Sequence, residues 1–131
     1  MLEKILCVDD DPITLMLCKK VIVKANFSKE ILFAQNGQEA IELLLQLQKE
    51  DKALLPELVF LDLNMPVMNG WDFLNEVCNS STIKLLNTKV VILSSTIDPS
   101  DYEKAKEYNV VSHFLSKPIT VELLEKLKNE V

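Results

Sequence analysis

The chain contains no arginine. Its 14 basic residues are all lysines and are outnumbered by 20 acidic residues, so the net charge at pH 7 is −6. Arginine is the side chain that reads guanine and grips phosphate through two parallel hydrogen bonds, and an acidic chain repels the nucleic-acid backbone. We therefore expect no direct contact between this protein and nucleic acid.

Histidine, cysteine and long apolar runs are also scarce. The one histidine, His113, is far in sequence from the three cysteines, which lack CxxC spacing, so no zinc site is expected. Unpaired thiols fit a reducing compartment. Glu3 and Lys4 interrupt the first apolar stretch, unlike a signal peptide, and no apolar run is long enough to span a membrane. These absences predict a cytoplasmic protein without membrane contact.

The remaining composition indicates one globular domain over residues 1–131. Apolar residues make up 48% of the chain, and a chain of this length buries a core without disulfides or metal. Short apolar runs alternate five times with helical patterns; the runs lie at about Ile5–Val8, Glu30–Ala34, Leu58–Leu61, Val90–Leu93 and 110–115. Such repeated units predict an α/β fold: a doubly wound parallel sheet with right-handed crossovers and helices on both faces.

Capping residues mark the predicted helix starts. Asp11 precedes a proline, and we interpret it as an N-cap, not as a metal ligand. Asn36 precedes a glutamate by three residues, which is the spacing of a capping box. Asp98 and Pro99 are expected to start another helix, in which Ser100 also has this spacing, and Thr120 is expected to cap the last helix. Gly70 is expected where a turn before a helix needs a permissive backbone.

Polar side chains follow four of the predicted strands. They are Asp9 and Asp10 after the first strand, Asp62 after the third, Ser94 after the fourth and Lys117 after the fifth. The carboxyl ends of parallel strands meet at one edge of the sheet, where folds of this kind bind their ligands. The sequence therefore predicts that these side chains form one site.

The composition of this predicted site indicates metal-assisted phosphoryl chemistry. Two carboxylates about 5 Å apart repel each other by roughly 3 kcal/mol, so the three aspartates should hold a cation or share a proton. Oxygen ligands without histidine or cysteine suit Mg²⁺ or Mn²⁺. An aspartate beside such a metal, a lysine and a hydroxyl can accept a phosphoryl group as an acyl phosphate.

The sequence resembles the response-regulator receiver domains of two-component signalling over nearly its whole length. Four blocks carry the resemblance, in the order and spacing of that family: Val8–Asp11, Leu61–Gly70, Leu93–Ser95 and Ser116–Pro118. The resemblance implies a flavodoxin-like sheet of five strands in the order 2-1-3-4-5. It also implies a phosphoprotein that is not a conventional enzyme but catalyses its own Mg²⁺-dependent phosphorylation and dephosphorylation.

The resemblance assigns a role to each acidic residue. Asp62 would be the phosphoacceptor and the main catalytic residue. Asp10 and Asp62 would bind the metal directly, together with the backbone carbonyl of Asn64, and Asp9 would bind it through a water molecule. Lys117 would pair first with the carboxylate and then with the phosphoryl group.

The resemblance also implies a switch. Ser94 and Phe114 would be the switch pair: the hydroxyl moves toward the phosphoryl group, and the aromatic ring rotates inward behind it. Phe114 replaces the tyrosine that is common in the family and so offers no hydroxyl. Asn64 and Thr96 take positions that tune the lifetime of the phosphoryl group, and the Lys117–Pro118 bond would be cis.

The implied partners are proteins. The phosphoryl donor would be the phosphohistidine of a histidine kinase or of a histidine phosphotransfer protein. The downstream target would be a protein that docks on the fourth helix, fifth strand and fifth helix. The signal would then pass through that partner, as in chemotaxis-type regulators or phosphorelay intermediates.

Other interpretations remain open at this point. The chain could be an interaction module that keeps the receiver fold but works without phosphorylation. A phosphohydrolase of the haloacid-dehalogenase type also uses a strand-end aspartate, but it needs a second aspartate where this chain has Asn64. Phe114 could be a packing residue instead of a switch, and we interpret Trp71 as packing and His113 as a surface residue.

Overall fold

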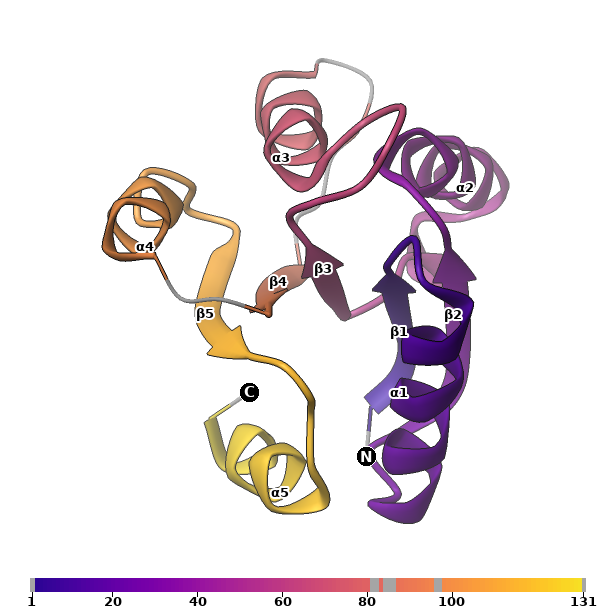
Figure 1. Ribbon diagram of the computed structural model, residues 1–131. Helices are drawn as coiled ribbons and strands as arrows, with labels where there is room; N and C mark the ends of the chain where they lie inside the picture. Colours follow the sequence, from indigo (N-terminus) through magenta and orange to yellow (C-terminus); the bar gives the residue numbers. More distant parts are fainter. Residues whose placement is uncertain (1, 81–82, 84–86, 96–97, 131) are drawn as a thin grey trace.

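The computed structural model describes residues 2–80, 83, 87–95 and 98–130 of the protein (Figure 1). Five parallel strands form one sheet in the order β2-β1-β3-β4-β5. The strands are β1 Leu2–Val8, β2 Ser28–Ala34, β3 Leu58–Asp62, β4 Lys89–Ser94 and β5 Val111–Ser116. The predicted fold class and strand order are confirmed, and the strands differ from the prediction only in their end residues.

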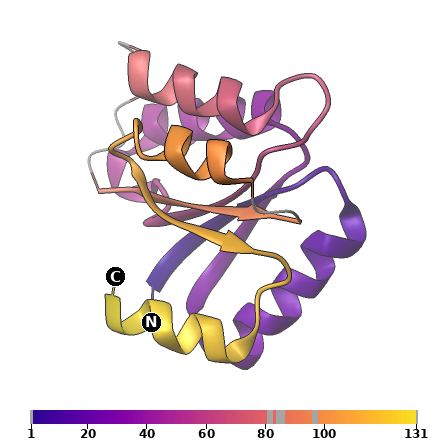
Figure 2. The same cartoon turned by 60° about the vertical axis from the view of Figure 1, so that its left-hand side comes forward.

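Helices cover both faces of the sheet (Figure 2). One face carries α1 and α5, and the other carries α2, α3 and α4. The helices are α1 Pro12–Lys24, α2 Gly37–Glu50, α3 Gly70–Asn79, α4 Pro99–Ala105 and α5 Val121–Glu130, and a short 3₁₀ turn, η1 Lys52–Leu54, follows α2. None of the helices in the described parts of the chain is long and apolar enough to cross a membrane.

The middle strands lie in the most buried part of the sheet. All five residues of β3 are buried, as are the last four of β1, because helices cover both faces of the sheet there. One apolar core fills the space under α2 and α3, and the other fills the space under α1 and α5. The carboxylate of Asp62 therefore stands at the end of a fully buried strand.

The predicted caps are confirmed at three helices. The side chain of Asp11 accepts a hydrogen bond from the N–H of Ile13, that of Asn36 from the N–H of Glu39, and that of Thr120 from the last helix. The box at Asn36 differs in one detail. The carboxylate of Glu39 accepts from the N–H of Gln35, one residue before the cap.

The predicted helix start at Asp98 and Pro99 is confirmed: the side chain of Asp98 accepts from the N–H of Ser100, and Pro99 is the first residue of α4, so Asp98 and not Ser100 is the cap. One local prediction is wrong. Gly70 does not have a positive φ. A Cβ on Gly70 would lie 2.6 Å from the carbonyl oxygen of Asp62 and 2.8 Å from the Cα of Leu63, so the glycine serves a close backbone approach.

Candidate functional site

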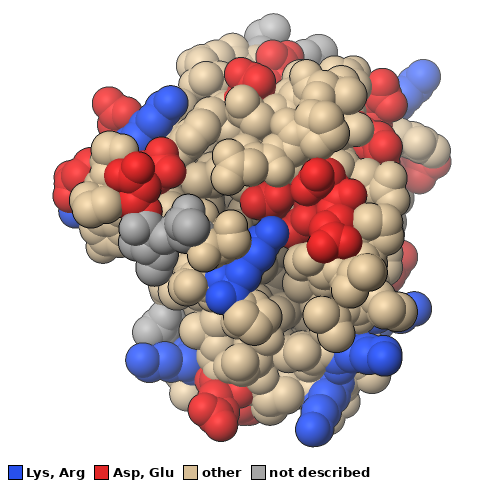
Figure 3. Space-filling model, viewed as in Figure 1, with Lys and Arg blue, Asp and Glu red and all other residues tan. Residues whose placement is uncertain are grey.

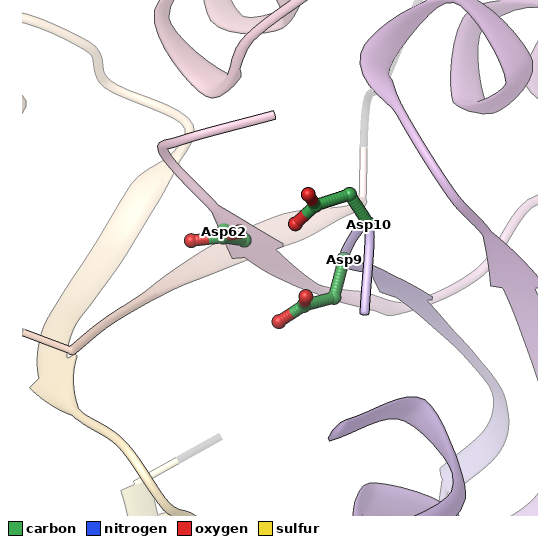
Figure 4. Close-up of side chains that lie close together, drawn as sticks. All are labelled: Asp9, Asp10 and Asp62. Atoms are coloured by element: carbon green, nitrogen blue, oxygen red, sulfur yellow. The ribbon is translucent and has the colours of Figure 1, made fainter. Parts of the chain in front are cut away.

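Three aspartates meet at the carboxyl edge of the sheet. Asp9 and Asp10 follow β1, and Asp62 ends β3, the strand beside it. One carboxylate oxygen from each lies within 4.8 Å of the others, close enough to surround one cation. Figure 4 shows the three side chains converging, and Figure 3 shows the acidic patch at the surface with a lysine beside it. The predicted clustering of these residues is confirmed.

Lys117 closes the site from the β5 side. Its Nζ lies 2.6 Å from Oδ2 of Asp9 and 3.5 Å from Oδ1 of Asp62, so its shorter ion pair is with Asp9. The N–H of Lys117 donates to the carbonyl oxygen of Ser94 at 2.8 Å, which ties the end of β5 to the end of β4. The Lys117–Pro118 peptide bond is cis, as expected from the resemblance.

Burial and charge shift the pKa values at the site. Burial raises the pKa of Asp62 above its ordinary value; the charge of Lys117 opposes the rise, and the charge of Asp9 adds to it. Burial lowers the pKa of Lys117, but its hydrogen bond to Asp9 and the two carboxylate charges outweigh burial and raise it overall. The lysine ammonium is thus firmly charged, and burial, more than the neighbouring charges, makes the ionised form of Asp62 less favourable.

Both oxygens of Asp9 already have protein partners. Oδ1 accepts a hydrogen bond from the N–H of Asp11 at 3.0 Å, and Oδ2 faces Lys117. Asp9 is buried, with 5% of the residue exposed, whereas Asp10 is exposed. Direct metal ligation by Asp9 would compete with one of these bonds, so its oxygens suit contact through a water molecule better.

The other predicted residues flank the acidic cluster. Asn64 is exposed, and its N–H donates to Oδ1 of Asp62 at 3.4 Å, so its backbone lies at the rim. Ser94 is 3% exposed and ends β4, one residue beyond the pairing of Leu93 with Asp62. Both stand where the sequence predicted them. Thr96 lies outside the described residues.

Phe114 lies on the α4 side of the sheet. Its ring is half-buried and meets the ring of Tyr102 edge-on, with centroids 5.9 Å apart. The Nζ of Lys106 lies 4.7 Å from the centre of the Tyr102 ring. Phe114 therefore contacts α4 directly, which is compatible both with packing and with the predicted switch.

Sequence reasoning missed two groups of contacts around the site. Trp71, at the start of α3, lies 6.0 Å from Tyr108 and carries the Nζ of Lys104 over its ring at 4.5 Å. Gly37 of α2 contacts Met68 in the connection between β3 and α3. These partners are far apart in the sequence and have no shared spacing, so no signal in the sequence could have found them.

The fold and the site together define a class of protein. A 2-1-3-4-5 parallel sheet with three carboxylates, a buried hydroxyl and a lysine at its carboxyl edge is the arrangement of a receiver domain. Residues 5–128 match the model of the response regulator receiver domain. The chain belongs to that family and has a phosphoacceptor role in two-component signalling.

Solved structures agree with this assignment. The chain is similar to a two-component response regulator from Cytophaga hutchinsonii, with a TM-score of 0.89 and 30% identity over 98% of this chain and 96% of that one. It is also similar to the chemotaxis protein CheY4 of Vibrio cholerae, with a TM-score of 0.76 and 27% identity over 100% and 99% of the two chains. The predicted flavodoxin-like receiver fold is confirmed.

Two curated relatives are longer than this chain. The "Probable methanogenesis regulatory protein FilR2" of Methanothrix harundinacea is 28% identical over 97% of this chain and 79% of its own length. The transcriptional regulatory protein HptR of Staphylococcus aureus is 34% identical over 93% of this chain, which spans 43% of HptR. Receiver domains bind Mg²⁺ at an acidic pocket and interact with histidine kinases and downstream targets.

Proposed function

We propose that Asp62 is the phosphoacceptor and that it takes its phosphoryl group from the phosphohistidine of a kinase or phosphotransfer protein. The observation that carries this proposal is the position of Asp62: 7% exposed, at the end of the central strand, and between two further carboxylates and a lysine. In the reaction, the bond from the histidine nitrogen to phosphorus breaks and a bond from a carboxylate oxygen of Asp62 to phosphorus forms. The imidazole ring, protonated on its other nitrogen, keeps the electron pair of the broken bond and leaves as neutral imidazole.

The carboxylates fit a hard divalent cation. We assign Asp10, Asp62 and the Asn64 carbonyl as direct ligands of Mg²⁺, or of Mn²⁺, and Asp9 as a ligand through water. The close approach of three carboxylates with a single nearby lysine supports a cation at this site. When bound, the metal neutralises charge on the phosphoryl oxygens.

The remaining polar side chains then have distinct tasks. Lys117 would turn from Asp62 to a phosphoryl oxygen, while its bond to Asp9 holds its ammonium in place. Ser94 would donate its hydroxyl to a second phosphoryl oxygen, since it ends the strand next to β3. With these groups in place before the reaction, the protein supplies positioning and charge, and needs no further nucleophile.

We propose Ser94 and Phe114 as the switch that carries the signal to the surface. Movement of Ser94 toward the phosphoryl group would open space for Phe114 to turn inward, away from Tyr102 on α4. Loss of the contact between Phe114 and Tyr102 would change the face formed by α4, β5 and α5. A groove of about 240 Å³ runs between α4 and β5 on this face. We assign this face to a downstream protein target, and the absence of arginine supports a protein and not nucleic acid.

We further propose that residues 1–131 form one receiver domain and that this domain acts in the cytoplasm. The alternative is an interaction module that works without phosphorylation. It would not need the acidic cluster, whose mutual repulsion costs stability unless a cation or a phosphoryl group gives it a use. The complete set of acids, hydroxyl and lysine supports the phosphoacceptor.

Intact mass after incubation with Mg²⁺ and acetyl phosphate tests the proposal. The parent should gain one phosphoryl group, and Asp62→Asn should gain none while keeping its fold, because its amide is no nucleophile. Asp11→Asn is the matched control, since Asp11 is an exposed cap beside the site. Phosphoryl uptake by Asp62→Asn would contradict the assignment. So would a lack of uptake by the parent and both variants, even with a kinase domain as the donor.

A further inference from the structure

Both glycines of the chain lie against the same loop. The chain has two glycines, Gly37 and Gly70, and the loop, residues 63–69, joins β3 to α3. Gly70 follows the loop directly, so its contact is local. Gly37 is the first residue of α2 and reaches the loop from a different element. Because the loop contains Asn64, a contact with α2 bears on the metal site.

The contact between Gly37 and Met68 leaves no room for a side chain. The N–H of Gly37 donates to the carbonyl oxygen of Met68 at 2.9 Å. A Cβ on Gly37 would lie 2.7 Å from Cγ of Met68 and 2.8 Å from that carbonyl oxygen. The methionine side chain can rotate away, but the carbonyl oxygen can move only if the backbone of the loop moves with it.

The loop needs an external hold because its own conformation is unfavourable. Val67 has φ of 67°, a left-handed value that a β-branched residue seldom adopts, and the N–H of Met68 donates to the carbonyl oxygen of Pro66 at 2.7 Å. Val67 is 83% exposed, so packing of its side chain does not compensate. Such a backbone persists where the surrounding structure fixes it. Here that structure includes Gly37 and the buried side chain of Met65.

We infer that Gly37 is a positioning residue for the metal site: through Met68 it fixes the loop that presents the backbone carbonyl of Asn64. Gly37 itself does not touch the carboxylates. The inference rests on the proposed function, since it requires Mg²⁺ at the acidic cluster. It goes further by extending the determinants of metal affinity to a residue of α2.

The effect of a substitution on Mg²⁺ affinity in the folded protein separates this role from a purely structural one. Helix propensity alone would make Gly37→Ala at the first position of α2 neutral or stabilising, so any loss of stability comes from the clash of the new Cβ with Met68. If the contact with Met68 positions the loop, the same change should weaken metal binding even where the protein is fully folded.

Calorimetric titration with Mg²⁺ is the primary test, on the parent, Gly37→Ala and Gln38→Ala. Gln38 is the next residue of α2 but is exposed, so it serves as the control. We expect Gly37→Ala to bind Mg²⁺ at least about tenfold more weakly, as when a supporting contact of a ligand is lost, and Gln38→Ala to bind like the parent. Phosphorylation of Gly37→Ala should need more Mg²⁺ but recover its rate at saturation.

Two further measurements complete the test. In the metal-free protein, the backbone amide NMR resonances of residues 63–65 and 67–69 should shift in Gly37→Ala and not in Gln38→Ala. If Gly37→Ala does not fold, Met68→Ala replaces it: this change adds no atoms and removes the side-chain part of the contact with Gly37 while the backbone hydrogen bond stays, so it should weaken Mg²⁺ binding in the same direction but less strongly.

The outcomes separate this inference from the function on which it rests. Equal Mg²⁺ affinity of Gly37→Ala and a phosphorylated parent would overturn the role of Gly37 and leave the phosphoacceptor intact. A parent that binds no Mg²⁺ and takes no phosphoryl group would overturn both. Unchanged affinity of Met68→Ala would likewise contradict the inference if that variant is the one that folds.

Discussion

The three carboxylates of the site lie at two corners, Asp9 and Asp10 at one and Asp62 at the other, and the two corners are built in different ways. Asp9 and Asp10 stand between β1 and α1, where the N–H of Asp11 binds Asp9 and the side chain of Asp11 caps the helix within two residues. Asp62 is followed by the longer loop of residues 63–69, whose shape depends on contacts with the first residues of α2 and α3. The corner of Asp9 and Asp10 is held by hydrogen bonds between adjacent residues, and the corner of Asp62 is held by contacts with other elements of the fold.

This difference separates what a short stretch of sequence determines from what packing determines. A cap acts over two or three residues and costs about 1 kcal/mol to remove. A loop held by distant backbone atoms responds to changes in elements that carry no functional residue. Lys117 joins the two corners, because it contacts Asp9 on one side and Asp62 on the other.

The largest effect should come from breaking both corners at once. Lys117→Met leaves two buried carboxylates without their cation, and we expect the metal-free protein to lose about 3 kcal/mol of unfolding free energy at pH 7. Urea denaturation measures the loss. Lys29→Met is the control, because its ion pair with Glu3 is exposed and should contribute well under 1 kcal/mol. Equal losses for the two variants would contradict this view of the site.

Breaking the loop corner alone should have the next largest effect. In Gly70→Ala the new Cβ would press on backbone atoms of Asp62 and Leu63, which cannot rotate away, so we expect a loss of about 2 kcal/mol. Thermal denaturation of this variant should be compared with Glu76→Ala, an exposed position of the same helix. A Gly70→Ala protein as stable as Glu76→Ala would show that the loop adapts freely.

Breaking the capped corner should have a smaller effect. Asp11→Ala removes the acceptor for the N–H of Ile13 and should cost about 1 kcal/mol in urea denaturation. Asp11→Asn keeps an acceptor oxygen and should stay near the parent. If Asp11→Asn were as unstable as Asp11→Ala, the charge and not the cap would be responsible.

The smallest effect concerns the titration of Asp62 in the metal-free protein. Because its folded pKa is raised above 3.8, the folded state becomes less favourable as pH rises through the interval between 3.8 and that pKa. Asp62→Asn removes this penalty, while Lys117 keeps its bond to Asp9. Unfolding curves across pH should therefore show the variant slightly more stable near neutrality, with no such gain well below pH 3.8. A gain independent of pH would have another cause.

The sequence determined much of the fold because its signals are local. The apolar runs that became β1, β3 and β4 and the caps at Asp11 and Asn36 each act within a few residues, and the order of strands followed from the family resemblance. The start of α4 at Asp98 and Pro99 was equally local, and there Asp98, not Ser100, is the cap. Gly70 was expected to serve conformation, but a packing distance explains it.

The site was predictable to the same degree. Asp62 ends a parallel strand, and Asp9, Asp10 and Lys117 follow the ends of two others; parallel strands bring their carboxyl ends together. That Lys117 lies closer to Asp9 than to Asp62 depends on side-chain geometry across three strands, which spacing does not encode. The hold of α2 on the loop was equally beyond the sequence.

The contacts of Trp71 have an optical consequence. This residue is the one tryptophan of the chain, it directly follows Gly70, and it lies under the ammonium group of Lys104 on α4 and beside the ring of Tyr108. Indole emission responds to a nearby cation and to a nearby phenol. A displacement of α4 relative to α3 would therefore change the native fluorescence, and the unlabelled protein carries its own gauge of that distance.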